Sequence, residues 1–319
     1  MRRIRRTAVL LRRGAATSIA IVILTSAGVV GMTPALAAPG RGTATSAASH
    51  ICTSAKRPKL AARISAGITA ALAGRSHSVV GLKVSDPAAG LTCGLRQTRH
   101  FYAASVIKVT ILSALLLKVH GPSNLTKHQR NLAYLMITQS NNAAATELWQ
   151  DVGMRGMQQF LNKAGMLHTV LSDAWGLTEI TARDELTQLQ VLTSKHKPLG
   201  KYSRTYVLGL MARVIPSERW GVPAGAPSDV TVHVKNGWLP YPQANEWNIN
   251  SIGAFTGKNI SYQIVILSGP AAGSQTESYG IQTVQAAAEV INRQLAGRSA
   301  APAAPVSLPG PAALAAPGG

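Results

Sequence analysis

The chain has 319 residues, with 32 lysines and arginines against 12 acidic residues, so its formal net charge is +20. The basic residues form no run interleaved with aromatic residues, which argues against a nucleic-acid-binding stripe. The two cysteines form no CxxC pair and no cluster with histidine, and no glycine-rich phosphate loop is present. We therefore expect no metal, no cofactor and no nucleic-acid partner.

The first 37 residues have the features of a secretory signal peptide. Six arginines precede an apolar run over residues 15–32, and the segment closes with Ala35-Leu36-Ala37. Serine, threonine and glycine interrupt the apolar run, which favours cleavage near Ala37 over a permanent membrane anchor. The pair Arg5-Arg6 resembles part of a twin-arginine signal without completing it, so the export route stays open. We expect a secreted protein, extracellular or associated with the cell wall.

The other end of the chain, residues 299–319, contains only Ala, Pro, Gly, Ser, Val and Leu. Such a segment has too few large apolar groups to offset the entropy lost on ordering, so it is predicted to be a disordered tail. Residues 38–54 are predicted to be an N-terminal linker, and residues 55–298 one domain. Removing the leader leaves a net charge near +14, which favours anionic cell-wall polymers as neighbours, although the charge can also serve solubility alone.

The N-terminal part of the domain predicts a helix followed by a hairpin. Residues 56–74 have apolar residues at helical spacing, residues 78–84 alternate as a strand does, and residues 91–95 form the returning strand after a turn. Cys93 falls on that strand, and Cys52 falls just before the helix. In an oxidising compartment an even number of cysteines favours a disulfide, which here connects the helix to the sheet. Two buried thiols are the alternative.

Helices dominate the middle of the chain and strands return near its end. Helices are predicted over residues 106–119, 124–137, 143–152, 154–164 and 181–193, and the first of these is apolar almost all round, as buried helices are. Strands are predicted over residues 230–234, 248–254 and 261–267, and a last helix over residues 276–295. This order predicts an α+β fold: a mainly antiparallel sheet, assembled from both ends of the chain and flanked by helices, with a helical lobe between.

Three short segments carry residues suited to acyl transfer. Ser105 and Lys108 lie three positions apart, so a helix places both side chains on one face. A serine hydroxyl needs a base to remove its proton, and a desolvated lysine can serve as that base. The S-x-x-K pattern alone is weak, but here it opens a buried helix. Ser140-Asn141-Asn142 and Lys235-Asn236-Gly237 follow it along the chain.

The order S-x-x-K, S-x-N, K-x-G resembles the signature set of class A β-lactamases and penicillin-binding proteins. Residues 136–145 are also similar to the segment that this superfamily carries around its second motif, and the resemblance covers about residues 78–295. It implies the β-lactamase/transpeptidase-like fold. It also implies a β-lactam or a peptidoglycan peptide as the small-molecule substrate, and we expect a monomer.

The resemblance implies a role for each matching residue. Ser105 attacks the carbonyl and becomes acylated, and Lys108 takes or relays its proton. Ser140 passes a proton to the leaving nitrogen. Asn142 binds the amide side chain of the substrate and holds Lys108, and Lys235 supplies positive charge to the substrate carboxylate and to Ser140.

The third motif is also expected to bind substrate, through Asn236, Gly237 and Trp238. In the family an oxyanion hole is made by two backbone N–H groups, which correspond here to those of Ser105 and Trp238. Losing one such donor costs roughly 2.7–4 kcal/mol of barrier lowering.

The sequence departs from the family pattern in three places. Asn141 stands where the second motif has Asp, and Asn236 stands where the third has Thr or Ser, which is expected to alter substrate binding. The glutamate that hydrolyses the acyl-enzyme in class A enzymes is replaced by Gly176, in a loop that is shortened. Glu179 is the nearest candidate for that role, and without it deacylation should be slow.

The interval between the first two motifs is short, at 35 residues, which predicts an open site suited to a larger or polymeric substrate. His233 lies two residues before Lys235 on a predicted strand, where it either faces the cleft or has a structural role. The expected function is a secreted serine hydrolase with weak deacylation. The alternative is a non-catalytic protein that keeps the fold and binds cell-wall fragments or β-lactams.

Overall fold

The computed structural model describes residues 50–194, 198–241, 246–271 and 275–296. The predicted leader, the predicted tail and most of the predicted linker lie outside these residues. Residues 52–54, which we placed in the linker, belong instead to the sheet of the domain. The N-terminal boundary predicted at residue 55 is therefore a few residues too late.

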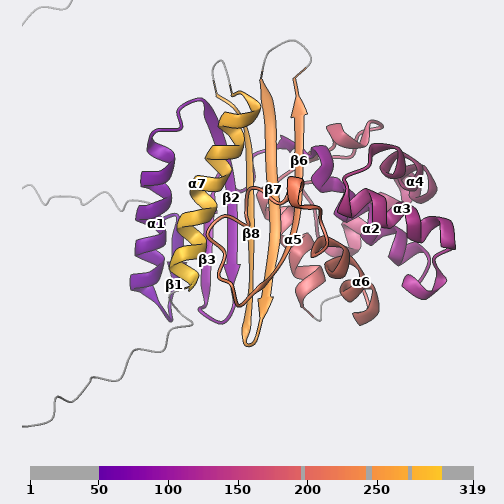
Figure 1. Cartoon of the computed structure of the whole chain (residues 1–319), viewed down its shortest axis with the longest axis horizontal. Coiled ribbons are helices and arrows are strands. Elements are labelled where there is room, and N and C mark those ends of the chain that lie inside the picture. The colour runs from indigo at the N-terminus through magenta and orange to yellow at the C-terminus, as the bar shows by residue number, and fades with distance from the viewer. Residues whose placement is uncertain (1–49, 195–197, 242–245, 272–274, 297–319) are drawn as a thin grey trace, which may run out of the picture. The chain divides into compact units, whose positions relative to one another are not determined.

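Six strands form one antiparallel sheet in the order β1-β3-β2-β8-β7-β6. They are β1 (Cys52–Ser54), β2 (Ser78–Asp86), β3 (Leu91–Leu95), β6 (Thr231–Pro240), β7 (Trp247–Gly257) and β8 (Ile260–Pro270). The N-terminal hairpin joins the C-terminal strands through β2 and β8 (Figure 1). The predicted sheet, assembled from both ends of the chain, is confirmed.

The disulfide lies at the edge of this sheet. Cys52 and Cys93 are directly opposite each other on β1 and β3 and are bonded. The predicted pairing is confirmed, but the bond joins two neighbouring strands and not a helix to the sheet. A three-residue strand gave no signal of its own in the sequence, because alternation needs a longer run to be seen.

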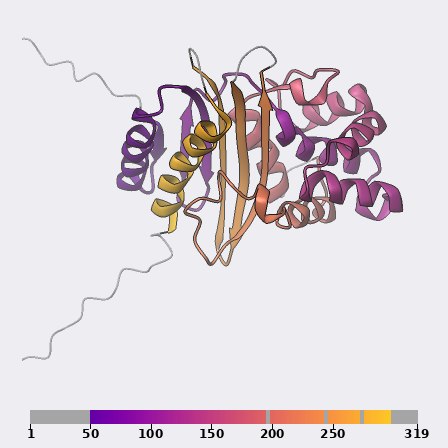
Figure 2. The ribbon, with the colours of Figure 1, turned by 45° about the horizontal axis from the view of Figure 1, so that its top comes forward.

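Two helices cover one face of the sheet, α1 (Pro58–Ala73) and α7 (Glu277–Ala296), and they lie side by side (Figures 1 and 2). Their apolar stripes face inward: Leu60, Ile64 and Ile68 of α1 are buried, and so is Ile291 of α7. Spacings of three and four residues place these side chains on one side of each helix. Together with the inner face of the strands they form one of two apolar cores.

The other core lies between the opposite face of the sheet and a lobe of five helices (Figure 1). These are α2 (Ile107–Lys118), α3 (Lys127–Thr138), α4 (Asn142–Ala164), α5 (Ala182–Thr193) and α6 (Lys201–Met211). Residues 107–116 of α2 are all buried, as predicted for a helix that is apolar almost all round.

One detail of the lobe differs from the prediction, because helix α6 was not predicted at all. The two helices predicted over residues 143–152 and 154–164 are confirmed: α4 has a kink at Gly153, where φ is 69° and the backbone is not helical. Among the described residues no helix is both long enough and apolar enough to cross a membrane.

Candidate active site

Ser105 lies in a single turn of 3-10 helix, η1 (Ala104–Val106), between the short strand β4 (Phe101–Tyr102) and α2. Strand β4 pairs with β5 (Glu179–Ile180), which anchors the chain just before the turn. Ala104 has φ 47°, a left-handed conformation that costs an alanine about 1–3 kcal/mol and occurs often at active sites. Ala104 is buried, so surrounding packing maintains this turn and leaves Ser105 partly exposed.

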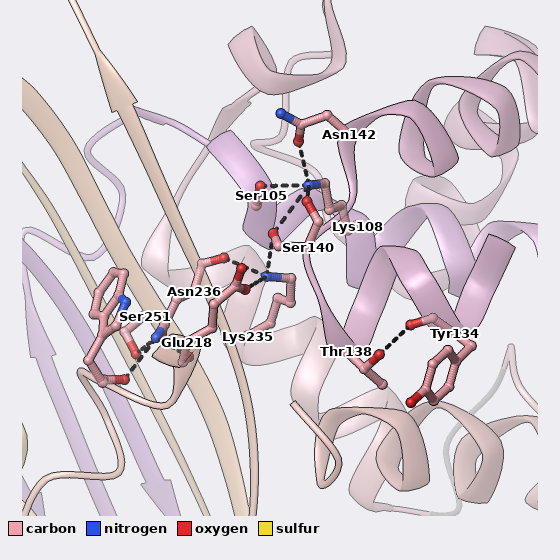
Figure 3. A network of polar contacts seen from close by, with 11 residues as sticks. Ser105, Lys108, Tyr134, Thr138, Ser140, Asn142, Glu218, Lys235, Asn236 and Ser251 are labelled. Atoms are coloured by element: carbon pink, nitrogen blue, oxygen red, sulfur yellow. Dashed lines mark hydrogen bonds and ion pairs between the residues drawn. The ribbon is translucent and has the colours of Figure 1, made fainter. Parts of the chain in front are cut away.

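Lys108 lies one helical turn beyond Ser105 and points back toward it (Figure 3). Its Nζ donates to Ser105 Oγ at 2.8 Å, to Asn142 Oδ1 at 2.8 Å and to the Ser140 carbonyl oxygen at 2.6 Å. The ammonium also lies 4.9 Å from the centre of the Trp175 ring. The structure therefore brings the predicted nucleophile and its predicted base into direct contact.

The surroundings of Lys108 lower the pKa of its side chain. Burial and, second to it, the nearby positive charge of Lys235 lower the pKa of Lys108 to about 7, while the Glu218 carboxylate opposes both. At neutral pH a large fraction of Lys108 is therefore uncharged. An uncharged amine 2.8 Å from Ser105 Oγ is placed to accept the proton that the serine loses on attack.

Ser140 connects the two lysines across the junction between α3 and α4. Its Oγ accepts from Lys235 Nζ at 2.8 Å and lies 3.2 Å from Lys108 Nζ. Its φ is 52°, a second left-handed non-glycine residue at this site. A hydroxyl between two amines can pass a proton from one side of the cleft to the other.

The middle residue of the second motif has a structural role. Asn141 is the N-cap of α4, and its Oδ1 accepts from the Ala144 backbone N–H at 2.8 Å. Asparagine and aspartate are about equally good in this position. The departure from the family pattern at Asn141 therefore leaves the geometry of Ser140 and Asn142 intact.

Lys235 is fully buried on β6 and donates to Ser140 Oγ and to the Asn236 carbonyl oxygen, the latter at 2.9 Å. Glu218, at the end of the short helix η4 (Pro216–Glu218), forms an ion pair with it, with Oε2 3.6 Å from Nζ. Burial lowers the pKa of Lys235 to about 8, and Glu218 opposes this shift. Sequence reasoning missed Glu218, because a single glutamate far from the motifs forms no pattern.

Gly237 lets strand β6 pass directly under the nucleophile. A Cβ atom at this position would lie 2.7 Å from the Ser105 backbone nitrogen and 2.9 Å from that of Val106. Distances this short are not tolerated, so only glycine permits this approach. The contact places the N–H of Ser105 beside the segment that carries Trp238, the pair predicted to form the oxyanion hole; that role stays a prediction.

Asn236 does not point into the cleft. Its Nδ2 donates to the carbonyl oxygens of Glu218 and Trp220, both at 2.9 Å, and its Oδ1 accepts from Ser251 Oγ at 2.6 Å. The side chain is fully buried and all its hydrogen-bonding groups are used. Neighbouring strand residues point to opposite faces, so Lys235 faces the lobe while Asn236 faces away. In this arrangement Asn236 offers no donor to the substrate carboxylate that we expected it to bind.

A hollow of about 280 Å³ opens beside the nucleophile. Its wall contains Trp175 and Leu177 from the short helix η3 (Trp175–Leu177), and Trp238 and Leu239 from β6. Within the described part of the chain, no acidic or basic residue lines it. Gly176 does line it, the residue that we expected to stand in place of the glutamate of class A enzymes.

Glu179 lies in β5, paired with Tyr102, and is not part of the lining of this hollow. The observed geometry therefore gives no support to its predicted role in deacylation. His233 is structural in this conformation: its ring nitrogens bond to the Leu208 carbonyl oxygen and to Thr256 Oγ1, both at 2.8 Å. Over the described ranges, no group of three His, Cys, Asp or Glu side chains is arranged to hold a metal ion.

Comparison with known proteins identifies a family and a fold. The model of the beta-lactamase enzyme family matches residues 120–295, more than half of the chain. The structure of PBP-A aligns with a TM-score of 0.62 at 18% identity, covering 73% of this chain and 95% of that one. A β-lactamase from Streptosporangium roseum aligns at 0.61 and 18%, covering 73% and 98%, and a class A β-lactamase from Bacteroides cellulosilyticus at 0.62 and 16%, covering 74% and 98%. At these identities the likeness shows a shared fold. No curated protein sequence matches significantly.

Proposed function

The chain belongs to the beta-lactamase enzyme family, and from this premise we propose that its domain is a serine hydrolase that forms an acyl-enzyme on Ser105. The observation that carries the proposal is the 2.8 Å contact between Ser105 Oγ and the buried Nζ of Lys108, whose pKa is lowered to about 7. A serine at the start of a buried helix has no structural need for such a base, whereas nucleophilic attack requires one.

The reaction follows from the contacts. Ser105 Oγ attacks the carbonyl carbon of an amide while its proton moves to Lys108 Nζ. The proton then passes through Ser140, which lies between Lys108 and Lys235, to the leaving nitrogen. The carbon–nitrogen bond breaks and the acyl group stays on Ser105; the amine leaves from a peptide amide, whereas in a ring-opened β-lactam it stays attached to the acyl group. We propose β-lactams or amides of the cell-wall peptide type as substrates. A mutant of PBP-A, which shares the fold, has been solved as an acyl-enzyme complex with penicillin G.

We further propose that the acyl-enzyme is hydrolysed slowly. Hydrolysis needs a base next to the attacking water, and in the described residues no carboxylate lines the hollow beside Ser105. Gly176 supplies nothing in place of a glutamate side chain. Export is proposed on two supports: the leader-like residues 1–37, and a disulfide that persists in oxidising compartments.

The test is to incubate the protein with penicillin G and to follow its intact mass over time by mass spectrometry. We expect one adduct per chain that forms and then persists, and no adduct on Ser105→Ala. Ser123→Ala, an exposed serine of the lobe, is the matched control and should label like the wild type. Circular dichroism of Ser105→Ala must match that of the wild type. Absence of both an adduct and drug consumption would contradict the proposal and favour a non-catalytic binding protein.

A further inference from the structure

The ammonium group of Lys235 is surrounded by oxygen atoms of the protein. It donates to Ser140 Oγ at 2.8 Å and to the Asn236 carbonyl oxygen at 2.9 Å, and Glu218 Oε2 lies 3.6 Å away as its ion-pair partner (Figure 3). The side chain is fully buried. A carboxylate on a substrate would therefore have to approach a buried ammonium group that already has two acceptors and one carboxylate around it.

The positive charge of Lys235 is also compensated. The Glu218 side chain is only 14% exposed, so little water screens its attraction for the ammonium. Removing a buried partner of this kind leaves an uncompensated charge, which is much more attractive to an incoming anion. Glu218 therefore governs how strongly this side of the cleft attracts a carboxylate.

Among the described residues, the cations nearest to Lys235 in the chain and in the site are engaged by other groups. Lys108 is occupied by Ser105, Ser140 and Asn142. The Arg219 guanidinium donates to the carbonyl oxygens of Ala212 and Val232. Strand β7, the neighbour of β6, contains no charged residue along its whole length. The described surroundings thus offer a substrate carboxylate no free positive charge.

The remaining wall of the site is apolar. Trp175 and Trp238 flank the hollow beside Ser105, together with Leu177 and Leu239. Aromatic and aliphatic walls favour flat or aliphatic groups that lose water on binding. They give an anionic group no compensation for its own desolvation.

We propose that Glu218, by compensating the charge of Lys235, removes the preference of the Ser105 site for acyl donors with a carboxylate beside the scissile bond, so that neutral esters or amides with an apolar acyl group react at least as fast. This inference rests on the proposed acyl-enzyme and widens its substrate class to neutral acyl donors. Ser105 Oγ forms the new ester bond, the bond from the carbonyl carbon to the leaving group breaks, and the leaving group receives the proton lost by Ser105.

The test uses two phenylacetylglycyl esters that differ in one group. The leaving group is 3-hydroxybenzoate in the anionic ester and 3-hydroxybenzamide in the neutral ester, so both give the same acyl-enzyme. The measurement is the second-order rate constant of phenol release, divided by the rate of hydroxide-catalysed hydrolysis to correct for leaving-group reactivity. Glu218 helps to keep Lys235 protonated, so the assay is run at about pH 6, where Lys235 keeps its proton in the variant as well. Protonation of Lys108 at this pH slows both esters alike and cancels in the ratio of their rate constants.

In the wild type the neutral ester should react at least as fast as the anionic ester. Glu218→Gln keeps the backbone carbonyl that Asn236 bonds to and removes the charge, so the anionic-to-neutral ratio should rise about tenfold or more. The matched control is Glu289→Gln, which removes an equal charge from an exposed pair with Arg293 and should leave the ratio unchanged.

Three outcomes would overturn the inference. If the wild type itself reacted tenfold faster with the anionic ester, the inference would be overturned, whether or not Glu218→Gln folds. An unchanged ratio in folded Glu218→Gln, or an equal fall in both rates, would show that Glu218 does not set selectivity. If neither ester and no penicillin G formed an acyl adduct, the proposed function would be overturned as well. This outcome differs from the first two, in which an acyl-enzyme still forms.

Discussion

Adding a single methyl group at Gly237 tests whether the approach of β6 to the nucleophile turn supports catalysis. In Gly237→Ala the new Cβ would lie 2.7 Å from the Ser105 nitrogen, 2.9 Å from the Val106 nitrogen and 3.0 Å from the Ala103 carbonyl oxygen. All three are backbone atoms, so no side chain can rotate out of the way. Overpacking of this kind costs about 1–3 kcal/mol, and displacing a reacting group by about 1 Å costs roughly 100-fold in rate.

The assay for Gly237→Ala combines urea unfolding with the rate of acylation by penicillin G. We expect a folded protein, destabilised by about 1–3 kcal/mol, that acylates roughly 100-fold more slowly. Gly176→Ala is the control, because Gly176 lines the same hollow and its Cβ would meet nothing within 4 Å. It should change neither quantity much. If Gly237→Ala acylated at the wild-type rate, the contact between β6 and η1 would have no catalytic meaning.

Three further predictions concern protons and the disulfide. The acylation rate should rise with pH through about 7, as Lys108 loses its proton, and fall above about 8, as Lys235 does; Lys108→Met should abolish the rising limb in a pH profile. Glu185 is fully buried, neither of its carboxylate oxygens has a hydrogen-bond partner among the described residues, and burial raises its pKa from 4.5 to about 8. The folded state then holds the extra proton, so the contribution of Glu185 to stability is greatest below pH 4.5 and falls by up to about 1.4 kcal/mol per pH unit toward 8. In urea unfolding, the stability of the wild type relative to Glu185→Gln should fall with this slope. Reducing the Cys52–Cys93 bond, which spans 41 residues, should lower the free energy of unfolding by about 4 kcal/mol in urea titrations with and without dithiothreitol.

The parts of the site that the sequence predicted are those that local geometry determines. Ser105 and Lys108 meet because helical positions three apart share a face, and each of the other two motifs is a run of consecutive residues. Five of the six strands of the sheet were predicted because they are long enough for their alternation to be seen, and four helices of the lobe were predicted from their apolar patterns.

The parts that were missed depend on contacts between distant segments. Glu218 reaches Lys235 only because η4 packs against β6. The orientation of the Asn236 side chain, away from the cleft, depends on its hydrogen bond with Ser251 of the neighbouring strand. Helix α6 contains Gly209 in its interior and is stabilised by burial of side chains such as Val207 and Leu210, which a weak local pattern did not reveal. These residues mark where the protein departs from what its motifs alone predict.

The most direct test of the account is to locate the acyl group. The penicillin G adduct is digested with a protease, and the modified peptide is sequenced by mass spectrometry. We predict a single modified residue, Ser105, in a peptide that is unmodified in Ser105→Ala. An acyl group found on Lys108, on Ser140 or on a surface lysine would contradict the assignment of Ser105 as the nucleophile.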